Sequence, residues 1–184
     1  MKKSRRISYT PTTPRRVGTS WSLDVHTWPL ASTPQGYKYV AVFMERTTRW
    51  IFIHFMKKKD EIVYALDDLR CYVKSNVGKR GISLEHIWTD EEGGLLKDET
   101  VGDWKSQYGV KVETEPKDQH WRNSTVEQSQ FQIELLTNIG MKFSGMPRSM
   151  WPFAYAHAVY CLNRRPCSAM LHVAGRERAT YEVL

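Results

Sequence analysis

Cysteine is scarce in this sequence, and long apolar runs are missing from it. The three cysteines, Cys71, Cys161 and Cys167, form no CxxC pair, which argues against a disulfide framework or a thiolate zinc site and suits a reducing compartment. No pair of histidines follows an HxxxH pattern, so a histidine zinc site is not expected either. Apolar runs such as Val40–Met44 are far too short to span a bilayer, and none of signal-peptide length follows the basic start. We expect a soluble protein.

The composition is that of one globular domain with a basic surface. The chain has 184 residues, of which 41% are hydrophobic and 26% charged, and this length is enough to bury a core without cross-links. The net charge is +7 and the sequence pI is about 9.3. This charge favours a polyanionic partner, with nucleic acid first and an anionic membrane second.

The first 18 residues differ from the rest of the chain. Residues 1–18 are rich in Lys, Arg, Ser, Thr and Pro and predict an extended basic arm before a domain over residues 19–184. Such an arm is either a plain disordered tail or a segment that contacts phosphates or directs nuclear import.

Hydrophobic periodicity predicts the order β-β-β-α-β-α-β-α-α. Period-two or apolar runs predict strands over residues 21–27, 37–44, 49–56, 84–90 and 110–114. Helical spacing predicts helices over 59–76, 95–108 and 124–139, and one that starts near Pro147 and ends at Arg164. Residues 116–123 are expected to form a polar loop, and Gly140 and Gly145 to interrupt the chain.

This order of elements predicts an α/β fold. A meander followed by βα units gives a mixed five-stranded sheet, with antiparallel and parallel strands, flanked by helices. The first and fourth strands can be central neighbours in it, and the helix that contains Glu127 can pack across them. Asp24 lies within the first strand and Asp90 at the end of the fourth, near the edge where ligands collect in such sheets.

Three acids, Asp24, Asp90 and Glu127, are therefore the candidate metal ligands. Asp24 is the best single candidate, because aspartate is disfavoured in the middle of a strand. Gathered carboxylates repel one another unless a cation lies between them, and Mg²⁺ prefers such oxygen ligands. Two alternatives remain open at this point: Glu91 or Glu92 could replace Asp90, and Ser124-x-x-Glu127 could be a helix capping box.

Three blocks of sequence resemble the retroviral-type integrase catalytic core, which has an RNase H-like fold and a DDE triad. The blocks are Ser22-Leu-Asp24, Trp88-Thr-Asp90 followed by Gly93-Gly94, and Asn123-Ser-Thr-Val-Glu127. The tail, Trp151–Pro166 and then Ala179–Leu184, is similar to integrases of copia-like LTR retrotransposons. The likeness extends over about residues 17–184.

The resemblance implies a polynucleotidyl transferase that inserts retrotransposon DNA into target DNA. Asp24, Asp90 and Glu127 would form the triad and hold Mg²⁺ or Mn²⁺, with two ions, while a 3′-hydroxyl attacks a phosphodiester of the target. The partners implied are the element's DNA ends, target DNA and further copies of the chain, with no membrane. The working place is the nucleus, after a stage in a cytoplasmic particle. The expected DNA contacts precede Glu127: Lys117, Trp121, Arg122 and Asn123.

The residues after Glu127 depart from the family pattern. Basic residues are common there, whereas this chain has Gln128, Ser129, Gln130 and Gln132. The sequence therefore leaves two alternatives open: a catalytically decayed or recruited DNA-binding or assembly module, and an RNase H-like nuclease.

Overall fold

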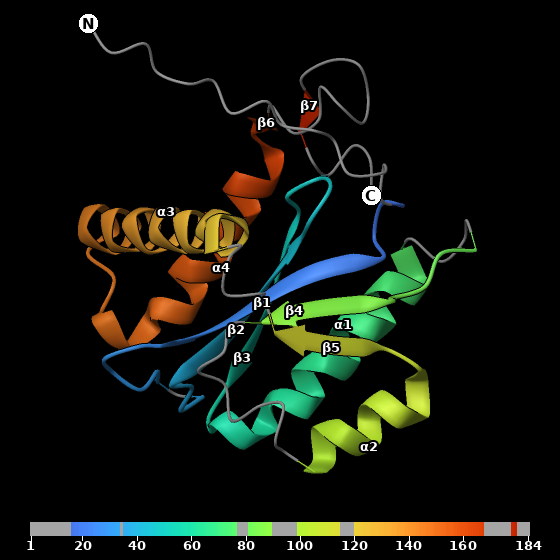
Figure 1. The fold of residues 1–184 in the computed structure, drawn as a ribbon. Coiled ribbons are helices and arrows are strands. Elements are labelled where there is room, and N and C mark those ends of the chain that lie inside the picture. Colours follow the sequence, from blue (N-terminus) through green and yellow to red (C-terminus); the bar gives the residue numbers. More distant parts are fainter. Residues whose placement is uncertain are drawn as a thin grey trace, which may run out of the picture.

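A computed structural model describes residues 16–33, 35–76, 81–89, 99–114, 120–167 and 178–179 of the chain, and gives the backbone alone at 120–125, 167, 178 and 179. Its centre is a five-stranded sheet in the order β3-β2-β1-β4-β5 (Figure 1). The strands β1, β2 and β3 form an antiparallel meander, and β4 and β5 continue the sheet in parallel with β1. The bounds of the strands are β1 Ser20–Thr27, β2 Tyr39–Glu45, β3 Ile51–Met56, β4 His86–Thr89 and β5 Lys111–Thr114. The predicted mixed sheet is confirmed.

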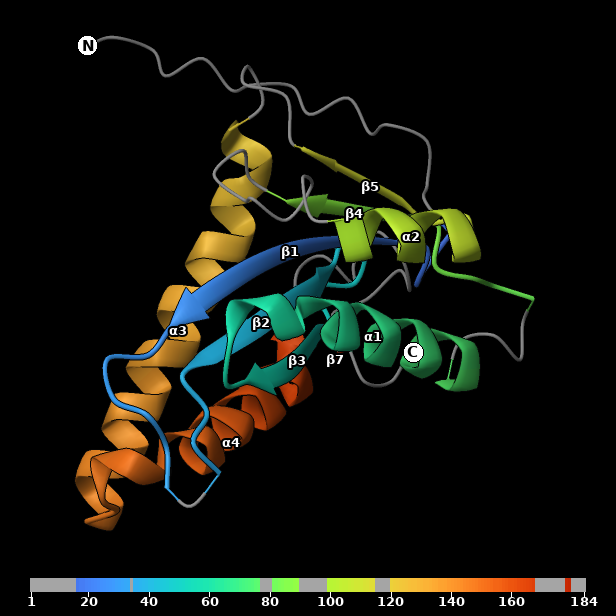
Figure 2. The same cartoon turned by 90° about the horizontal axis from the view of Figure 1, so that it is seen from below.

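Helices cover both faces of this sheet. Figure 2 shows α1 and α2 on one side and α3 and α4 on the other. The bounds are α1 Ile62–Asn76, α2 Glu99–Tyr108, α3 His120–Ser144 and α4 Trp151–Arg164, with 3₁₀ turns at Lys59–Glu61 and Arg148–Met150 and a two-residue ribbon of β6 Pro166–Cys167 with β7 Arg178–Ala179. In the described part of the chain, no helix combines the length and hydrophobicity that crossing a bilayer requires.

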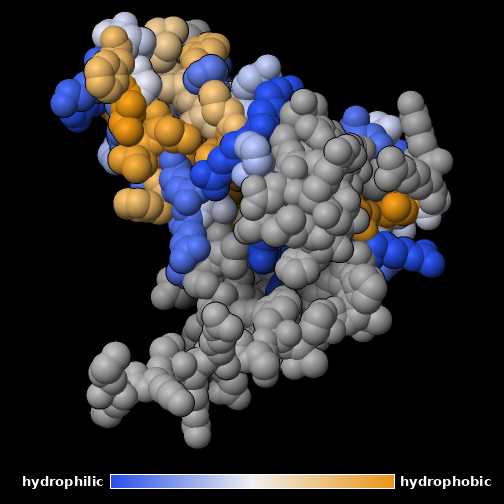
Figure 3. All heavy atoms as spheres, turned by 90° about the horizontal axis from the view of Figure 1, so that it is seen from above, coloured by the Kyte–Doolittle hydropathy of each residue, from blue (hydrophilic) through white to orange (hydrophobic). Residues whose placement is uncertain are grey.

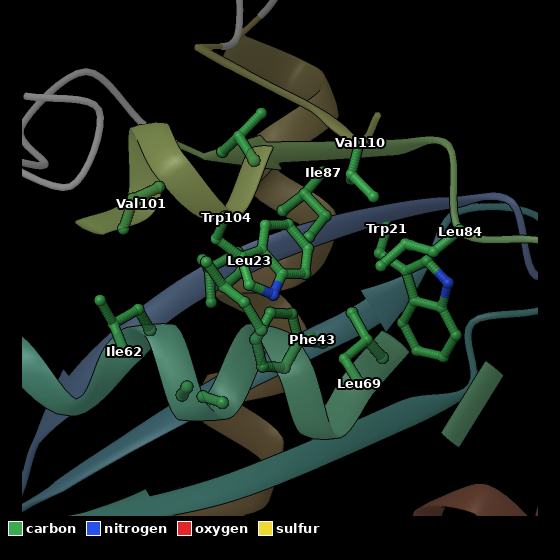
Figure 4. Close-up of a cluster of buried hydrophobic side chains, with 14 of the residues drawn as sticks. Trp21, Leu23, Phe43, Ile62, Leu69, Leu84, Ile87, Val101, Trp104 and Val110 are labelled. Atoms are coloured by element: carbon green, nitrogen blue, oxygen red, sulfur yellow. The ribbon is translucent and has the colours of Figure 1, made fainter. Parts of the chain in front are cut away.

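Each face of the sheet has its own apolar core. Successive side chains of a strand point to opposite faces, so Ala41 and Phe43 of β2 join the cluster under α1 and α2, while Val40 and Val42 join the cluster under α3 and α4. Figure 4 shows the first cluster, in which Trp21 and Leu23 of β1 face Ile62 and Leu69 of α1 and Trp104 of α2. Because Trp21 and Leu23 face α1, the alternate positions of β1 face α3 and α4.

The helix that contains Glu127 is longer than predicted. It begins at His120, so the loop predicted over residues 116–123 is wrong from residue 120 onward, and Ser124 does not cap its start. It also continues through Gly140 to Ser144. Between Val126 and Met141 its inner side buries apolar residues, including Ile133, and this burial outweighs the cost of about 1 kcal/mol for one helical glycine.

A buried carboxylate closes the far end of the meander. Glu45, at the end of β2, has no exposed surface and accepts hydrogen bonds from the backbone N–H groups of Gly18, Thr47 and Thr48. The hydroxyl of Thr48 donates to the same carboxylate, at 2.7 Å. These bonds hold the turn between β2 and β3 and attach Gly18 to the sheet. Most of the predicted basic arm, residues 1–15, lies outside the described residues, and the domain boundary stays a prediction.

Candidate active site

Asp24 lies on the central strand of the sheet. It is paired with Val42 across the antiparallel β1–β2 register and is half-buried. Because Trp21 and Leu23 belong to the α1 side, the period of the strand directs Asp24 to the side covered by α3 and α4. An acid in this place is partly shielded from solvent by a helix layer and lies one residue beyond the paired end of β4.

The neighbouring strand β4 ends at the same level. Its last residue, Thr89, is buried and pairs in parallel with Leu23, the residue before Asp24. The prediction that the first and fourth strands are central neighbours is therefore confirmed. Asp90, the next residue of the chain, lies outside the described residues, as do Glu91 and Glu92.

Glu127 lies in α3, which contacts β1. Its side chain is exposed, whereas the preceding Val126 is 1% exposed within the core. Two turns later Glu134, on the same side of the helix, reaches the sheet. Glu127 also lines an open hollow on α3 together with Gln128, Phe131, Gln132 and Leu135. The helix thus places Glu127 at the border between the buried side and the solvent.

The predicted DNA contacts are in the first turn of α3 rather than in a loop. Trp121, Arg122 and Asn123 have helical backbone, and their side chains are outside the described part. Lys117 lies outside the described residues. All four assignments stay predictions.

Sequence reasoning missed a group of polar residues beside Asp24. His26, two residues further along β1, places its Nδ1 atom 3.3 Å from Oε1 of Glu134. Strand alternation places His26 on the same face of β1 as Asp24, and a spacing of seven residues places Glu134 on the same side of the helix as Glu127. Both patterns occur so often in sequences that neither one singles out a functional residue.

Tyr155 of α4 completes this group. It is fully buried, and among the described residues its hydroxyl has no hydrogen-bond partner. Burial raises the pKa of this hydroxyl far above its ordinary value, and the nearby negative charges of Glu134 and Asp24 raise it further. No sequence signal marked Tyr155, because its position fits the apolar stripe of the helix.

The described acids suit Mg²⁺ by their chemistry, since carboxylate oxygens are its preferred protein ligands. Among the residues that the structure describes, no three His, Cys, Asp or Glu side chains are clustered closely enough to hold an ion. Of the predicted trio, Asp24 and Glu127 are among the described residues, and Asp90 is not.

The fold is that of a retroviral integrase catalytic core. The structure is similar to the HTLV-2 integrase catalytic core domain in complex with magnesium, in its trimeric form (TM-score 0.63, 17% identity, covering 90% of this chain and 95% of that one) and its dimeric form (TM-score 0.61, 17%, 90% and 94%). It is also similar to a chain of the simian T-cell lymphotropic virus intasome in complex with PP2A regulatory subunit B56 gamma (TM-score 0.66, 12%, 90% and 54%).

The sequence is similar to retrovirus-related Pol polyproteins of plant transposons. The identity is 24% with transposon RE2 and 25% with transposon RE1 of Arabidopsis thaliana, each over 143 residues and 78% of this chain. It is 22% over 131 residues, 71% of the chain, with transposon TNT 1-94 of Nicotiana tabacum. The chain spans only 9% to 10% of the length of these relatives. No family model matches it. The resemblance to a retrotransposon integrase core is confirmed.

Proposed function

We propose that this chain is the catalytic core of an integrase-type polynucleotidyl transferase that joins the DNA ends of a retrotransposon to target DNA. In this proposal Asp24, Asp90 and Glu127 are the metal-binding triad. The fold and the transposon relatives support the class of function, and the positions of Asp24 on β1 and of the end of β4 beside it support the choice of residues.

The observation that carries the proposal is the register between β1 and β4. Thr89 of β4 pairs with Leu23 of β1. The two predicted aspartates, Asp24 and Asp90, are the residues that directly follow the two members of this pair. Consecutive Cα atoms are about 3.8 Å apart, which keeps Asp90 close to the end of β4. α3 contacts β1 on the side that Asp24 faces, so it is the helix suited to supply the third carboxylate.

Magnesium is the cofactor that this donor set favours. The similar HTLV-2 core is in complex with magnesium, and an all-carboxylate set suits that ion. Bound Mg²⁺ would supply Lewis-acid activation of the attacking hydroxyl and stabilise the charge on the phosphate, with two ions as the expected number. The protein's own part is to hold the three acids in fixed positions and to bind the DNA backbone through its net positive charge.

The decisive experiment is a DNA-joining assay with a recessed 3′-hydroxyl end and a plasmid target, in Mg²⁺ or Mn²⁺. Asp24→Asn, Asp90→Asn and Glu127→Gln should each reduce joining by at least about 10²-fold, because each removes a metal ligand. Asp103→Asn, which changes an exposed acid of α2, is the matched control and should keep full activity. Full activity in any of the three triad variants would remove that residue from the proposal.

The same variants separate the alternatives. A decayed or recruited DNA-binding module would bind DNA equally well with all three acids changed and would join none in any form. An RNase H-like nuclease would instead hydrolyse the RNA strand of an RNA–DNA hybrid. Because the proposed target is chromosomal DNA, we also propose that the chain works in the nucleus, and as a multimer that holds two DNA ends.

A further inference from the structure

The outer side of α4 carries a histidine and a cysteine one helical turn apart. Nε2 of His157 lies 3.6 Å from Sγ of Cys161, and both side chains are exposed. The opposite side of the helix is buried through residues such as Trp151, Tyr155 and Leu162. Figure 3 shows the side of the molecule that α3 and α4 cover, where hydrophilic side chains lie beside apolar ones. The pair is therefore accessible from solvent and separate from the acids of the candidate active site.

The distance between the two donor atoms is the one that a tetrahedral zinc ion requires. Zinc binds a histidine nitrogen at about 2.0–2.1 Å and a cysteine sulfur at about 2.3 Å. With a tetrahedral angle at the metal, these bonds place the two donors about 3.5–3.6 Å apart, and the observed distance between His157 Nε2 and Cys161 Sγ is 3.6 Å. Paired histidines bind zinc with the same spacing of i and i+4 on one face of a helix. Both atoms can therefore bind one ion without a change in the backbone of α4.

Neighbouring side chains orient the histidine ring. The rings of His157 and Tyr160 are stacked, with their centroids 6.3 Å apart and their planes 10° apart. The guanidinium of Arg164 lies over the Tyr160 ring, 3.5 Å from its centroid. This stack restricts rotation of the imidazole, and an ordered ligand loses less conformational freedom on binding.

The electrostatics of this end of α4 admit a cation. Cys161 lies in the last turn of the helix, which ends at Arg164, and the carbonyl groups of a last turn carry partial negative charge. Arg164 and Arg165 oppose a cation there, but both guanidinium groups have partners. The first donates to the carbonyl of Tyr160 and the second to Oε1 of Gln132.

The donor set selects the kind of metal. A thiolate with an imidazole suits zinc, whereas Mg²⁺ prefers oxygen ligands. We propose that His157 and Cys161 form a two-ligand site for Zn²⁺. On binding, Cys161 releases its thiol proton to solvent, and neutral His157 binds through the lone pair of Nε2. Since no group of three ligands occurs among the described residues, water completes the coordination shell.

The sequence patterns for zinc sites miss this pair, because it is neither CxxC nor HxxxH but one residue of each kind. The proposal is independent of the proposed function, because none of the three predicted catalytic acids takes part in it.

Titration of the full chain with cobalt(II), followed by absorption, tests the site. Cobalt bound by a thiolate gives a charge-transfer band in the near ultraviolet, and cobalt bound by oxygen ligands alone does not. With Cys71 and Cys167 changed to Ser, Cys161 is the only thiol, and the reduced protein should still give the band. Zn²⁺ should then abolish it by displacing the cobalt, because zinc binds such ligands more tightly. The absence of a band with millimolar cobalt overturns the proposal.

Variants in this background show whether both side chains bind the ion. Cys161→Ser should remove the band, and His157→Ala should weaken cobalt binding at least tenfold, because one of the two protein ligands is lost. His54→Ala, which changes a histidine of β3, is the matched control and should keep the affinity. Asp24→Asn should also keep the band, which separates this site from the proposed triad. Thermal unfolding confirms that each variant folds. Cobalt binding that is unaffected by His157→Ala overturns the proposal.

A chemical measurement tests the site without a histidine variant. In the background that retains only Cys161, saturating Zn²⁺ should slow alkylation of the thiol by iodoacetamide at least tenfold, because the metal-bound sulfur is no longer free to react. An alkylation rate that Zn²⁺ does not change would also overturn the proposal.

Discussion

At the scale of single residues, Tyr155 is a polar group placed in an apolar layer. Its ring packs against Trp28, Phe55 and Trp151, at centroid distances of 6.0 to 6.1 Å. Its hydroxyl has no hydrogen-bond partner among the described residues, and burial with the charges of Glu134 and Asp24 raises its pKa. The ring therefore stabilises the α4 layer, whereas the hydroxyl opposes that stability.

Tyr155→Phe should not destabilise the protein at neutral pH. Removing an unpartnered buried hydroxyl is expected to raise the free energy of unfolding by up to about 1 kcal/mol. In the wild type, the unfolded chain loses the phenol proton near pH 10, while the folded chain keeps it because the pKa is raised. Stability should therefore fall as the pH rises above about 10, and fall less steeply in Tyr155→Phe.

Urea unfolding between neutral pH and pH 11 measures both effects of Tyr155→Phe, with exposed Tyr64→Phe as the control. A loss of more than about 1 kcal/mol at neutral pH in Tyr155→Phe would mean that the hydroxyl makes a stabilising hydrogen bond.

At the scale of elements, one side chain attaches α4 to the edge of the sheet. Asn163 Nδ2 donates to the carbonyl of Ile51 at 2.8 Å, and its Oδ1 accepts from the N–H of the same residue at 2.9 Å. The side-chain amide thus makes the two backbone hydrogen bonds that a neighbouring strand would otherwise make with Ile51, which is 6% exposed. β3 is an edge strand, and its unpaired backbone groups need such partners.

Asn163→Ala should leave both backbone groups of Ile51 unpartnered. We expect a loss of about 2–4 kcal/mol in the free energy of unfolding, because each unsatisfied buried group costs about 1–3 kcal/mol. Asn138→Ala, at an exposed site of α3, should change stability by less than about 0.5 kcal/mol. Equal effects in the two variants would argue against this role of Asn163.

Gly140 within α3 and Gly145 directly after it should respond in opposite ways to alanine. Gly140 lies inside the helix, and a Cβ there would meet nothing within 4 Å, so Gly140→Ala should stabilise by about 0.5–1 kcal/mol. Gly145 follows the end of the helix at a φ of 68°, where Gly145→Ala should destabilise by about 1 kcal/mol. Thermal unfolding of the two variants in parallel measures the difference, and stabilisation by Gly145→Ala would contradict the assigned helix end.

The sequence was sufficient to predict which elements form and how they are ordered, because period-two and helical patterns report burial directly. It failed at both ends of α3. A polar first turn resembled a loop, and Gly140 resembled a helix end. Only the contacts of α3 with α4 and the sheet show that its inner side stays buried from Val126 to Met141. The glutamate–histidine contact and Tyr155 were missed for a related reason: they depend on how β1 lies against α3 and α4, which come much later in the chain.

At the scale of the whole molecule, positive charge is distributed unevenly. The net charge is +7, yet residues 123–141 of α3 contain no basic residue. Apart from Arg122 in the first turn of α3, a DNA-binding surface should therefore use basic residues of other segments.

DNA binding by this chain should depend steeply on salt. If the net positive charge drives binding, the logarithm of the association constant should fall linearly with the logarithm of the salt concentration, by about 0.9 for each phosphate neutralised. Fluorescence anisotropy with a labelled duplex, measured without divalent metal, gives this slope. Asp24→Asn should leave the slope unchanged, because Asp24 contributes no cation. An affinity that does not vary with salt would show that the basic surface does not bind the DNA backbone, and the fold would then have to hold DNA through contacts with bases alone.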